Sequence, residues 1–131
     1  KSSVGVIIET KRPSNKGEMI TTDNLNKKAF HELILYYMRE RIIHKNVEIK
    51  HLIITNINEW FIFNATTFDR LFAQNKSFVK QFTDFEKIIF CYHCLSSSSS
   101  DNPCSAPRIR SSAVSDICNG VIGCIEIDSA I

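Results

Sequence analysis

The sequence contains few glycines and prolines, the residues that interrupt helices and strands. Its 131 residues include only four glycines and three prolines, whereas 44% of them are hydrophobic. A collagen-like repeat and a wholly disordered chain are therefore excluded, and the length suits one globular domain. No apolar run approaches the roughly 20 residues of a membrane span, and no signal peptide opens the chain, so no membrane partner is expected. The net charge of +2 is too small to indicate a nucleic-acid partner by itself.

Several motifs of known chemistry are also missing. The patterns G-x-G-x-x-G, G-x-x-x-x-G-K-[ST] and G-x-S-x-G do not occur, which removes support for nucleotide cofactors, P-loop chemistry and serine hydrolases. The four histidines form no i,i+4 pair, so the helical zinc-protease motif is absent as well.

The first 90 residues lack cysteine, and the composition changes abruptly at that point. All five cysteines lie after residue 90, whereas all nine phenylalanines and the single tryptophan lie at or before it. Residues 1–90 carry a net charge of +4, residues 91–131 carry −2, and a run of five serines occupies positions 96–100. Such a change is typical of two unlike pieces of chain.

We therefore predict a partial domain over residues 1–90, followed by a Ser- and Cys-rich, mostly irregular tail over residues 91–131. The tail has no sustained periodic pattern except at residues 121–127, which can form one short strand. It is interpreted as a linker or as readthrough of unrelated sequence. Because the chain begins at Lys1, directly before a strand-like run, we expect a fragment of a larger protein.

Strand-like runs alternate with helical patterns in residues 1–90. Residues 4–10, 48–55 and 59–64 are short β-branched or aromatic runs that predict strands. The residues at 56–58 predict a tight hairpin turn between the last two strands. A helix between the first two strands and another after the third give the order β-α-β-β-α, which indicates an α/β fold with a mixed sheet.

The first predicted helix spans residues 25–45, with Asp23 or Asn24 as its cap. Its apolar residues recur at intervals of three and four and predict a stripe that packs on the sheet: Phe30, Leu33, Ile34, Tyr37 and Met38. Thr66 and Asp69 form a capping-box pattern that predicts the start of the second helix. This helix is predicted to run through Phe72, and the apolar spacing then continues toward Phe90 at Phe78, Phe82 and Phe85.

The pattern E-x-K, formed by Glu9 and Lys11, closes the first predicted strand, where alternation places both side chains on one face. A carboxylate beside an ammonium group at a strand end suits metal-assisted hydrolysis of a phosphodiester. The carboxylate can bind Mg²⁺, while the lysine positions or deprotonates the attacking water or stabilises charge on the phosphate. The same pattern also occurs as a solvated salt bridge at the end of an ordinary strand, and the residues alone leave both interpretations open.

Glu32 and Tyr36 are one turn apart on the first predicted helix, so Glu32 can face the strand end that carries Glu9. The alternative is that Glu32 is solvated or paired with Lys28, while Tyr36 belongs to the core. Both interpretations are consistent with the pattern.

Basic residues cluster around this region: Lys11, Arg12, Lys16, Lys27 and Lys28. In a nuclease they would contact DNA phosphates and make binding depend on salt, whereas in another protein they form an ordinary solvated loop. Trp60, Phe61 and Phe63 alternate on the third strand. They either stack on bases or form the core, and their spacing favours the core.

Cys91 and Cys94 form a C-x-x-C pattern that invites a zinc interpretation, with further ligands from the later cysteines. The spacing after Cys94 fits no standard second pair, and five is an odd number. The pattern therefore favours free thiols over zinc and over a disulfide framework.

Three motifs occur together in a recognisable order. Residues 6–90 carry E-x-K at 9–11, F-H-E-x-x-L-Y-Y at 30–37 and E-W-F-I-F at 59–63. This combination resembles the amino-terminal nuclease region of large single-chain restriction–modification enzymes of type IIG or IIL, which combine DNA cleavage with adenine methylation. The resemblance covers about two thirds of the chain. It implies a PD-(D/E)XK, or restriction-endonuclease-like, fold with its active site at the strand ends of a mixed sheet.

The resemblance implies a cytoplasmic endonuclease that binds double-stranded DNA and uses Mg²⁺, with Mn²⁺ as a substitute. Glu9 would be a metal ligand, and Lys11 would activate water or stabilise charge. Glu32 would be a supporting acid, and Tyr36 would orient Glu32 or pack under it.

Two departures from the family pattern lower this expectation. The metal-binding Asp of the family lies upstream of E-x-K, on the preceding strand, whereas here no Asp occurs before Asp23. The methyltransferase and target-recognition regions of the parent enzyme would follow residue 90, where nothing matches them. We therefore expect this chain alone to be inactive. Two other functions stay open: a non-catalytic α/β module that binds DNA or protein on the same scaffold, and a small binding unit built on a zinc-stabilised tail.

Overall fold

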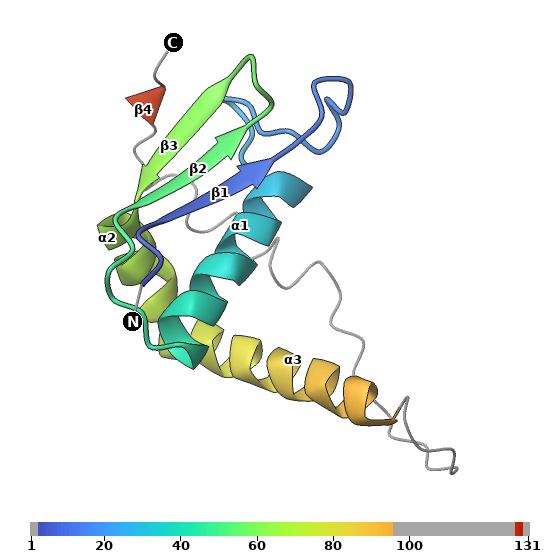
Figure 1. Cartoon of the computed structure of the whole chain (residues 1–131), viewed down its shortest axis with the longest axis vertical. Coiled ribbons are helices and arrows are strands. Elements are labelled where there is room, and N and C mark those ends of the chain that lie inside the picture. The colour runs from blue at the N-terminus through green and yellow to red at the C-terminus, as the bar shows by residue number, and fades with distance from the viewer. Residues whose placement is uncertain (1–2, 96–127, 130–131) are drawn as a thin grey trace.

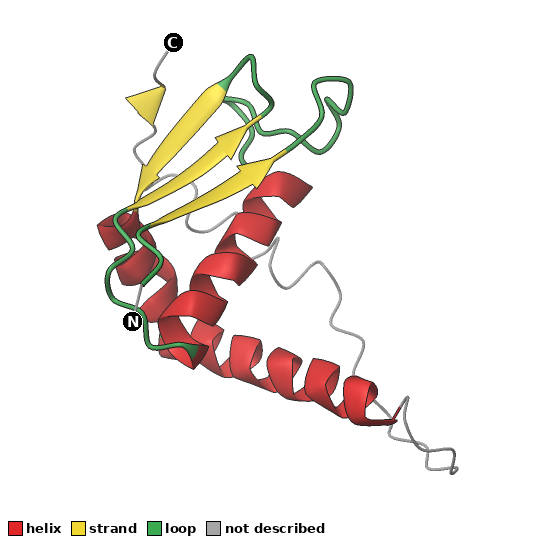
Figure 2. Cartoon of the chain, viewed as in Figure 1, coloured by secondary structure: helices red, strands yellow, loops and turns green. Residues whose placement is uncertain are grey.

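The computed structural model describes residues 3–95 and 128–129, in which helices pack against one sheet (Figure 1 and Figure 2). The elements in chain order are β1 (Val6–Thr10), α1 (Lys28–Met38), η1 (Arg39–Ile43), β2 (His51–Thr55), β3 (Trp60–Asn64), α2 (Ala65–Phe68), η2 (Asp69–Ala73), α3 (Lys76–Leu95) and β4 (Asp128–Ser129). The segments η1 and η2 are π-helical turns that continue α1 and α2 directly.

The sheet is mixed and has the strand order β1-β2-β3-β4. β1 and β2 are parallel, with α1 in the crossover between them, whereas β2 and β3 form an antiparallel hairpin. β4 pairs antiparallel with β3. The predicted α/β fold and the order β-α-β-β-α are therefore confirmed. The predicted strands began slightly too early, because pairing of β1 with β2 starts only at Val6, opposite His51.

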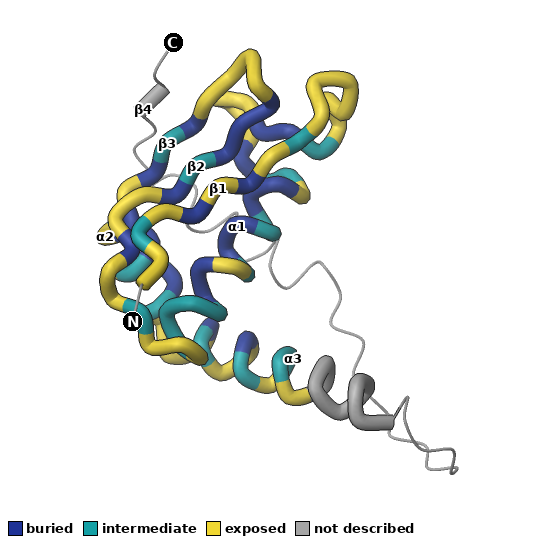
Figure 3. Tube along the Cα trace, in the orientation of Figure 1, coloured by how far each residue is buried: buried dark blue, intermediate teal, exposed yellow. Residues whose placement is uncertain are grey.

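The core lies between α1 and the sheet face that it covers (Figure 3). The five residues predicted for the apolar stripe of α1 are all buried: Phe30, Leu33, Ile34, Tyr37 and Met38. The inward positions of the strands are buried opposite them: Ile7, Leu52, Ile54, Phe61 and Phe63. Burial of one large apolar side chain contributes about 1.5–3 kcal/mol, so this face supplies most of the energy that holds helix to sheet.

Phe68 of α2 lies at the centre of an aromatic cluster. Its ring centroid is 5.2–5.8 Å from those of Phe30, Tyr37, Phe63 and Phe72, with tilted or edge-to-face geometry. Aromatic pairs prefer such arrangements to a face-to-face stack. Because the rings come from α1, β3, α2 and η2, the cluster fixes α1 against the segment that follows β3.

The other face of the sheet is more open. Val6 and Ile8 of β1 are 43% and 53% exposed, and Ile53 and Ile62 of the next two strands are half-buried. Ile8, Ile53 and Ile62 form one row across the three strands. Within the described residues, α1 packs on the opposite face and leaves this one apolar and partly exposed.

Helix α1 begins later than predicted, because the chain before it packs as a turn. Thr21 and Asn24 form an isolated bridge, and the Asn24 side chain accepts a hydrogen bond from the backbone N–H of Asn26 at 3.0 Å. Neither Asp23 nor Asn24 caps the helix, whose N-cap is Lys27 with no side-chain hydrogen bond. The prediction of the cap was therefore wrong. At the other end, η1 continues the helical path to Ile43, close to the predicted end.

The predicted capping box at the second helix was also wrong. The N-cap is Asn64, the last residue of β3, whose side-chain oxygen accepts a hydrogen bond from the N–H of Thr66 at 2.8 Å. Asp69 does not reach back to Thr66, because its carboxylate binds Arg41 of η1. The helix therefore follows β3 without a loop.

Helix α3 runs through the point at which the composition changes. It continues to Leu95, five residues beyond the predicted boundary at residue 90, so the boundary falls inside a helix. The strand predicted at 121–127 lies outside the described residues. Among the described residues, no helix is long and apolar enough to cross a membrane.

Candidate functional site

The E-x-K residues meet at the end of β1. Glu9 occupies an inward position of the strand, and its carboxylate lies 3.0 Å from the Lys11 ammonium nitrogen. The backbone N–H of Lys11 donates to the carbonyl oxygen of Thr55 at 2.9 Å, which extends the β1–β2 pairing past the end of the strand. The side chains of Glu9 and Lys11 are each only 11% exposed. The sheet itself therefore fixes both groups.

Helix α1 contributes the second carboxylate. The Lys11 ammonium group donates a hydrogen bond to Glu32 Oε2 in the second turn of the helix, and the Glu32 side chain is 27% exposed. Because α1 returns antiparallel to β1, its first turns lie over the strand end (Figure 1). Lys11 thus joins the sheet to the helix between the carboxylates of Glu9 and Glu32.

Glu18 is a third carboxylate of this cluster, and it was not identified from the sequence. Its carboxylate oxygens lie 3.7 Å from Lys11 Nζ and 3.2 Å from Lys28 Nζ. Its backbone carbonyl accepts a hydrogen bond from the Ala29 N–H at 3.1 Å, at the start of α1. The next two residues, Met19 and Ile20, are buried. An acidic residue directly before a buried apolar pair was the available signal, because such a pair anchors the loop and holds the carboxylate in place.

Lys28 completes the network from the first turn of α1. Its ammonium nitrogen lies 3.2 Å from Glu18 and 3.9 Å from Glu32, four residues further along the helix. The Lys28 side chain is 58% exposed, so it forms the outer part of the cluster. We call the five residues Glu9, Lys11, Glu18, Lys28 and Glu32 the Lys11 cluster.

The ion pairs of the Lys11 cluster stabilise the charged forms of its members. Burial works against the charge of Lys11, but the hydrogen bonds and ion pairs with Glu32 and Glu9 outweigh it and raise the pKa of the ammonium above its ordinary value of 10.5. The hydrogen bond from Lys28 lowers the pKa of the Glu18 carboxyl. At neutral pH Lys11 is therefore a cation in this arrangement. It is suited to stabilise negative charge and not to remove a proton from water.

His31 lies beside the cluster on α1. Its Nε2 is 2.8 Å from the side-chain oxygen of Asn26. Burial lowers the pKa of the imidazole, and the neighbouring Glu32 only partly offsets this effect. The neutral ring, with the proton on Nε2, is therefore the form that fits this hydrogen bond.

The other residues predicted for the site lie around the cluster. Tyr36 is 41% exposed, and among the described residues no hydrogen bond joins it to Glu32. Arg12 and Lys16 are exposed on the loop after β1, while Lys27 is half-buried at the start of α1. Tyr36 is therefore not part of the core. We call Arg12, Lys16 and Lys27 the rim of the Lys11 cluster.

The aromatic residues of β3 differ in their exposure to solvent. Phe61 and Phe63 are buried, as the core interpretation predicted, whereas Trp60 is 44% exposed. The core interpretation is therefore wrong for Trp60, which lies at the first position of β3, where the hairpin turn leaves the sheet.

The carboxylates of Glu9 and Glu32 fit a hard divalent cation in chemical type. Both contact the same nitrogen, and Mg²⁺ is commonly held by one or two carboxylates together with substrate phosphate. In the described part of the chain, no group of three or more His, Cys, Asp and Glu side chains is arranged to hold a metal ion. Lys11 instead lies between the two carboxylates. The cysteines proposed for zinc fall where no side chains are described.

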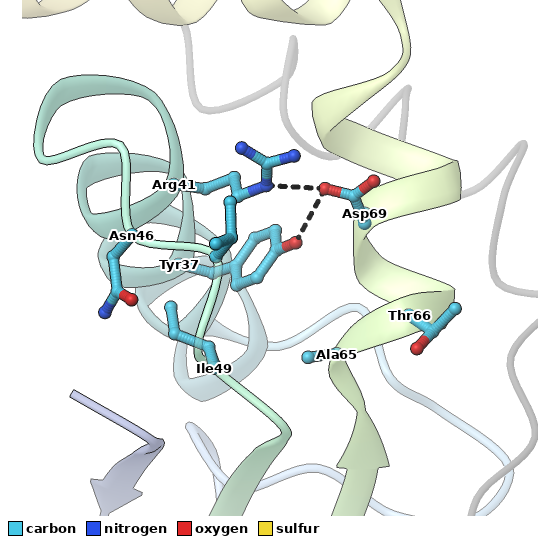
Figure 4. Close-up of a pocket in the computed structure, with 8 residues that line it drawn as sticks. Tyr37, Arg41, Asn46, Ile49, Ala65, Thr66 and Asp69 are labelled. Carbon is cyan, nitrogen blue, oxygen red and sulfur yellow. Dashed lines mark hydrogen bonds and ion pairs between the residues drawn. The ribbon is translucent and has the colours of Figure 1, made fainter. Parts of the chain in front are cut away.

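A second polar site lies at the other end of α1 (Figure 4). An open pocket of about 210 Å³ is lined by Tyr37, Arg41, Asn46, Val47, Ile49, Ala65, Thr66 and Asp69. Asp69 accepts hydrogen bonds from Arg41 Nε at 2.7 Å and from the Tyr37 hydroxyl at 3.3 Å. Burial, followed by the Asp69 charge, raises the pKa of the Tyr37 hydroxyl. These bonds join the helical segments on the two sides of the pocket, which indicates a structural role.

Comparison with known proteins places the chain in a family but not in a functional class. A protein-family model described as "Domain of unknown function (DUF7149)" matches residues 1–90. The chain therefore belongs to this family, and the match includes every residue of the Lys11 cluster. No curated protein and no solved structure matches the chain.

Proposed function

We propose that this chain is part of a cytoplasmic DNA endonuclease domain that hydrolyses phosphodiester bonds with Mg²⁺ or Mn²⁺. The parent protein would be a restriction–modification enzyme, as the sequence resemblance implies. The observation that carries the proposal is the Lys11 ammonium group, held between the carboxylates of Glu9 and Glu32 at the end of β1. The side chains of Glu9 and Lys11 are enclosed, with 11% exposure each.

The roles of the residues follow from their positions. Glu9 and Glu32 would hold the divalent cation, which when bound would polarise the phosphate and the attacking water. Lys11, a cation at neutral pH, would then move from its carboxylate partners toward the phosphate and stabilise the charge that develops there. Glu18 and Lys28 carry opposite charges, so this pair would leave the net charge of the cluster unchanged while it joins the loop to the start of α1. The exposed Arg12 and Lys16 would contact phosphates on either side.

Binding of duplex DNA and cleavage of plasmid DNA test this proposal in two stages. We expect Ca²⁺ or Mg²⁺ to tighten binding of duplex DNA by the wild-type chain, and Glu9→Gln and Glu32→Gln to remove that effect. Lys50→Ala is the matched control. It replaces an exposed lysine directly before β2, at the end of that strand opposite to Thr55, and should behave as wild type. Binding that does not respond to a divalent cation overturns the nuclease proposal.

Cleavage distinguishes a working site from an incomplete one. We expect little or no cutting with Mg²⁺ or Mn²⁺, because the sequence supplies no Asp upstream of Glu9. Cutting that falls by about 10²–10³-fold in Lys11→Ala would instead show that another residue of this chain replaces that Asp.

One observation favours a second function, a non-catalytic module on the same scaffold. The Lys11 cluster is a closed set of ion pairs, and Lys11 occupies the space that a cation between Glu9 and Glu32 would need. A cluster of this kind can simply fasten α1 to the sheet and leave the rim to bind DNA or protein. DNA binding that is indifferent to divalent cations and to Glu9→Gln is the result that identifies such a module.

A further inference from the structure

The tip of the β2–β3 hairpin, at the end of the sheet that carries the Lys11 cluster, exposes two apolar residues. Ile57 is 75% exposed and Trp60 is 44% exposed. The hairpin leaves the sheet at Thr55, the residue whose carbonyl oxygen accepts the hydrogen bond from the Lys11 backbone. Figure 1 shows the turn and the loop that follows β1 leaving the same end of the sheet. Trp60 alternates with the buried Phe61 and so lies on the sheet face opposite to Glu9, and a ligand that contacts both the tip and the Lys11 cluster has to lie across this end of the sheet.

Ile57 adopts a backbone conformation that its side chain disfavours. Its φ angle is 78°, in the left-handed region that glycine and asparagine tolerate and β-branched residues avoid. The side chain gains little from burial in return, because three quarters of it is exposed. Turn formation does not explain an isoleucine at this position, since glycine or asparagine would suit the left-handed backbone better. Core packing does not explain it either, because the residue is largely exposed.

The turn is nevertheless held firmly. The Thr55 hydroxyl accepts a hydrogen bond from the Ile57 N–H at 3.0 Å, and Asn56 Oδ1 accepts from the Glu59 N–H at 2.8 Å. The Trp60 indole N–H donates to the Ile57 carbonyl oxygen at 3.2 Å, which ties the second exposed side chain to the first. Strained residues persist where neighbouring contacts fix them in this way, and such positions are concentrated at functional sites.

We propose that Ile57 and Trp60 form an apolar wedge that contacts the bases of double-stranded DNA while the rim of the Lys11 cluster contacts its phosphates. The inference rests on the proposed function, which names the partner. Proteins that bend DNA insert isoleucine and similar side chains against base steps, and an indole ring stacks on bases of any sequence. The basic residues Arg12 and Lys16 lie on the adjacent loop, which gives the wedge a phosphate-binding border on one side.

The fluorescence of Trp60 tests the wedge directly, because it is the only tryptophan of the chain. A labelled DNA duplex is titrated with the full chain in Ca²⁺, and its anisotropy reports binding. The emission of Trp60 is recorded in the reverse titration with unlabelled duplex. We expect DNA to quench and shift this emission over the same concentration range in which the anisotropy changes.

Variants separate the wedge from the phosphate contacts. Ile57→Asn suits the left-handed backbone and should fold, yet it should weaken DNA binding about tenfold without changing the dependence of affinity on salt. Arg12→Ala should weaken binding and reduce the slope of log affinity against log salt by about one. Val47→Asn is the matched control: it replaces a 67% exposed β-branched residue at the opposite end of the sheet and should bind DNA as wild type.

Each outcome has one meaning. Quenching of Trp60 together with weaker binding by Ile57→Asn supports the wedge. DNA binding with unchanged Trp60 emission and wild-type affinity of Ile57→Asn overturns the wedge and leaves the proposed function in place. Absence of DNA binding overturns both. If the wavelength of the Trp60 emission maximum shifts with protein concentration but not with DNA, the tip takes part in self-association. That result overturns the wedge as well.

Discussion

The Lys11 ammonium group donates a hydrogen bond to the carboxylate of Glu32, a residue 21 positions further along the chain. This contact joins the end of β1 to α1, and Glu9 contributes to the same ammonium group from within the strand. The three side chains are at most 27% exposed. Ion pairs on an open surface contribute little to stability, but removing one partner of a largely buried pair leaves a charge without compensation. The cluster is therefore as much a part of the fold as of the candidate site.

The stability of the fold should depend on Lys11. We expect Lys11→Met to lower the free energy of unfolding by about 2 kcal/mol, because Glu9 and Glu32 then face each other without a cation between them. Urea denaturation followed by circular dichroism measures the change. Lys28→Met is the matched control, and its loss should stay below about 0.5 kcal/mol because that side chain is 58% exposed. Equal losses in the two variants contradict the view that enclosure makes the Lys11 pairs strong.

A double-mutant cycle should show that Lys11 and Glu32 act on each other. We expect Lys11→Met and Glu32→Gln to cost less together than the sum of the two separate losses, with a coupling free energy of about 1–2 kcal/mol. The exposed pair of Lys87 and Asp84, 3.9 Å apart on α3, provides the control cycle and should show coupling close to zero. Additive losses at Lys11 and Glu32 would mean that the hydrogen bond between them does not contribute to stability.

The sequence predicted the sheet and the helix that covers it, because both follow from the period of apolar residues. The apolar residues from Phe30 to Met38 lie on one side of the helix, so that side packs on the sheet. The helix caps were predicted wrongly, since Asn24 and Asp69 have alternative partners that are distant in sequence or within a turn. Such a choice between local and distant hydrogen bonds depends on how the segments pack, and no pattern of neighbouring residues reveals it.

The part of the candidate site that lies on regular secondary structure could also be predicted from the sequence. Glu9, Lys11 and Glu32 follow from alternation along a strand and from the face of a helix, so their approach could be expected. Glu18 lies on a loop without a period, and its position depends on the burial of Met19 and Ile20. The sequence marks Glu18 by its position directly before an apolar pair, but its contact with Lys11 follows from the packing of that loop.

The stability of the protein should fall in mild acid through His31. Burial lowers the pKa of this imidazole in the folded state below its ordinary value of 6.5. The unfolded chain then binds a proton before the folded chain does, so stability is fully present above pH 6.5 and decreases as the pH falls below it toward the folded-state pKa. We expect the midpoint of urea unfolding to decrease between pH 7 and pH 5.

The variant His31→Gln isolates this effect. Glutamine keeps a donor for the hydrogen bond to Asn26 but does not titrate, so its unfolding midpoint should depend less steeply on pH over the same range. His51→Gln replaces an exposed histidine of β2 and should follow the wild-type curve. If His31→Gln keeps the full wild-type dependence, the acid sensitivity has another source.

The strain at Ile57 should be measurable as lost stability. The left-handed conformation costs roughly 1–2 kcal/mol for an ordinary L-residue, and asparagine tolerates it better than a β-branched side chain does. Because Ile57 is 75% exposed, its replacement removes little buried apolar area. We therefore expect Ile57→Asn to raise the free energy of unfolding by about 1 kcal/mol. Ile57→Val keeps the β-branch and serves as the control that should leave stability unchanged. A gain in Ile57→Asn combined with weaker DNA binding would show that the protein retains a less stable turn for the sake of a contact, whereas a loss of stability would mean that the isoleucine holds the hairpin together.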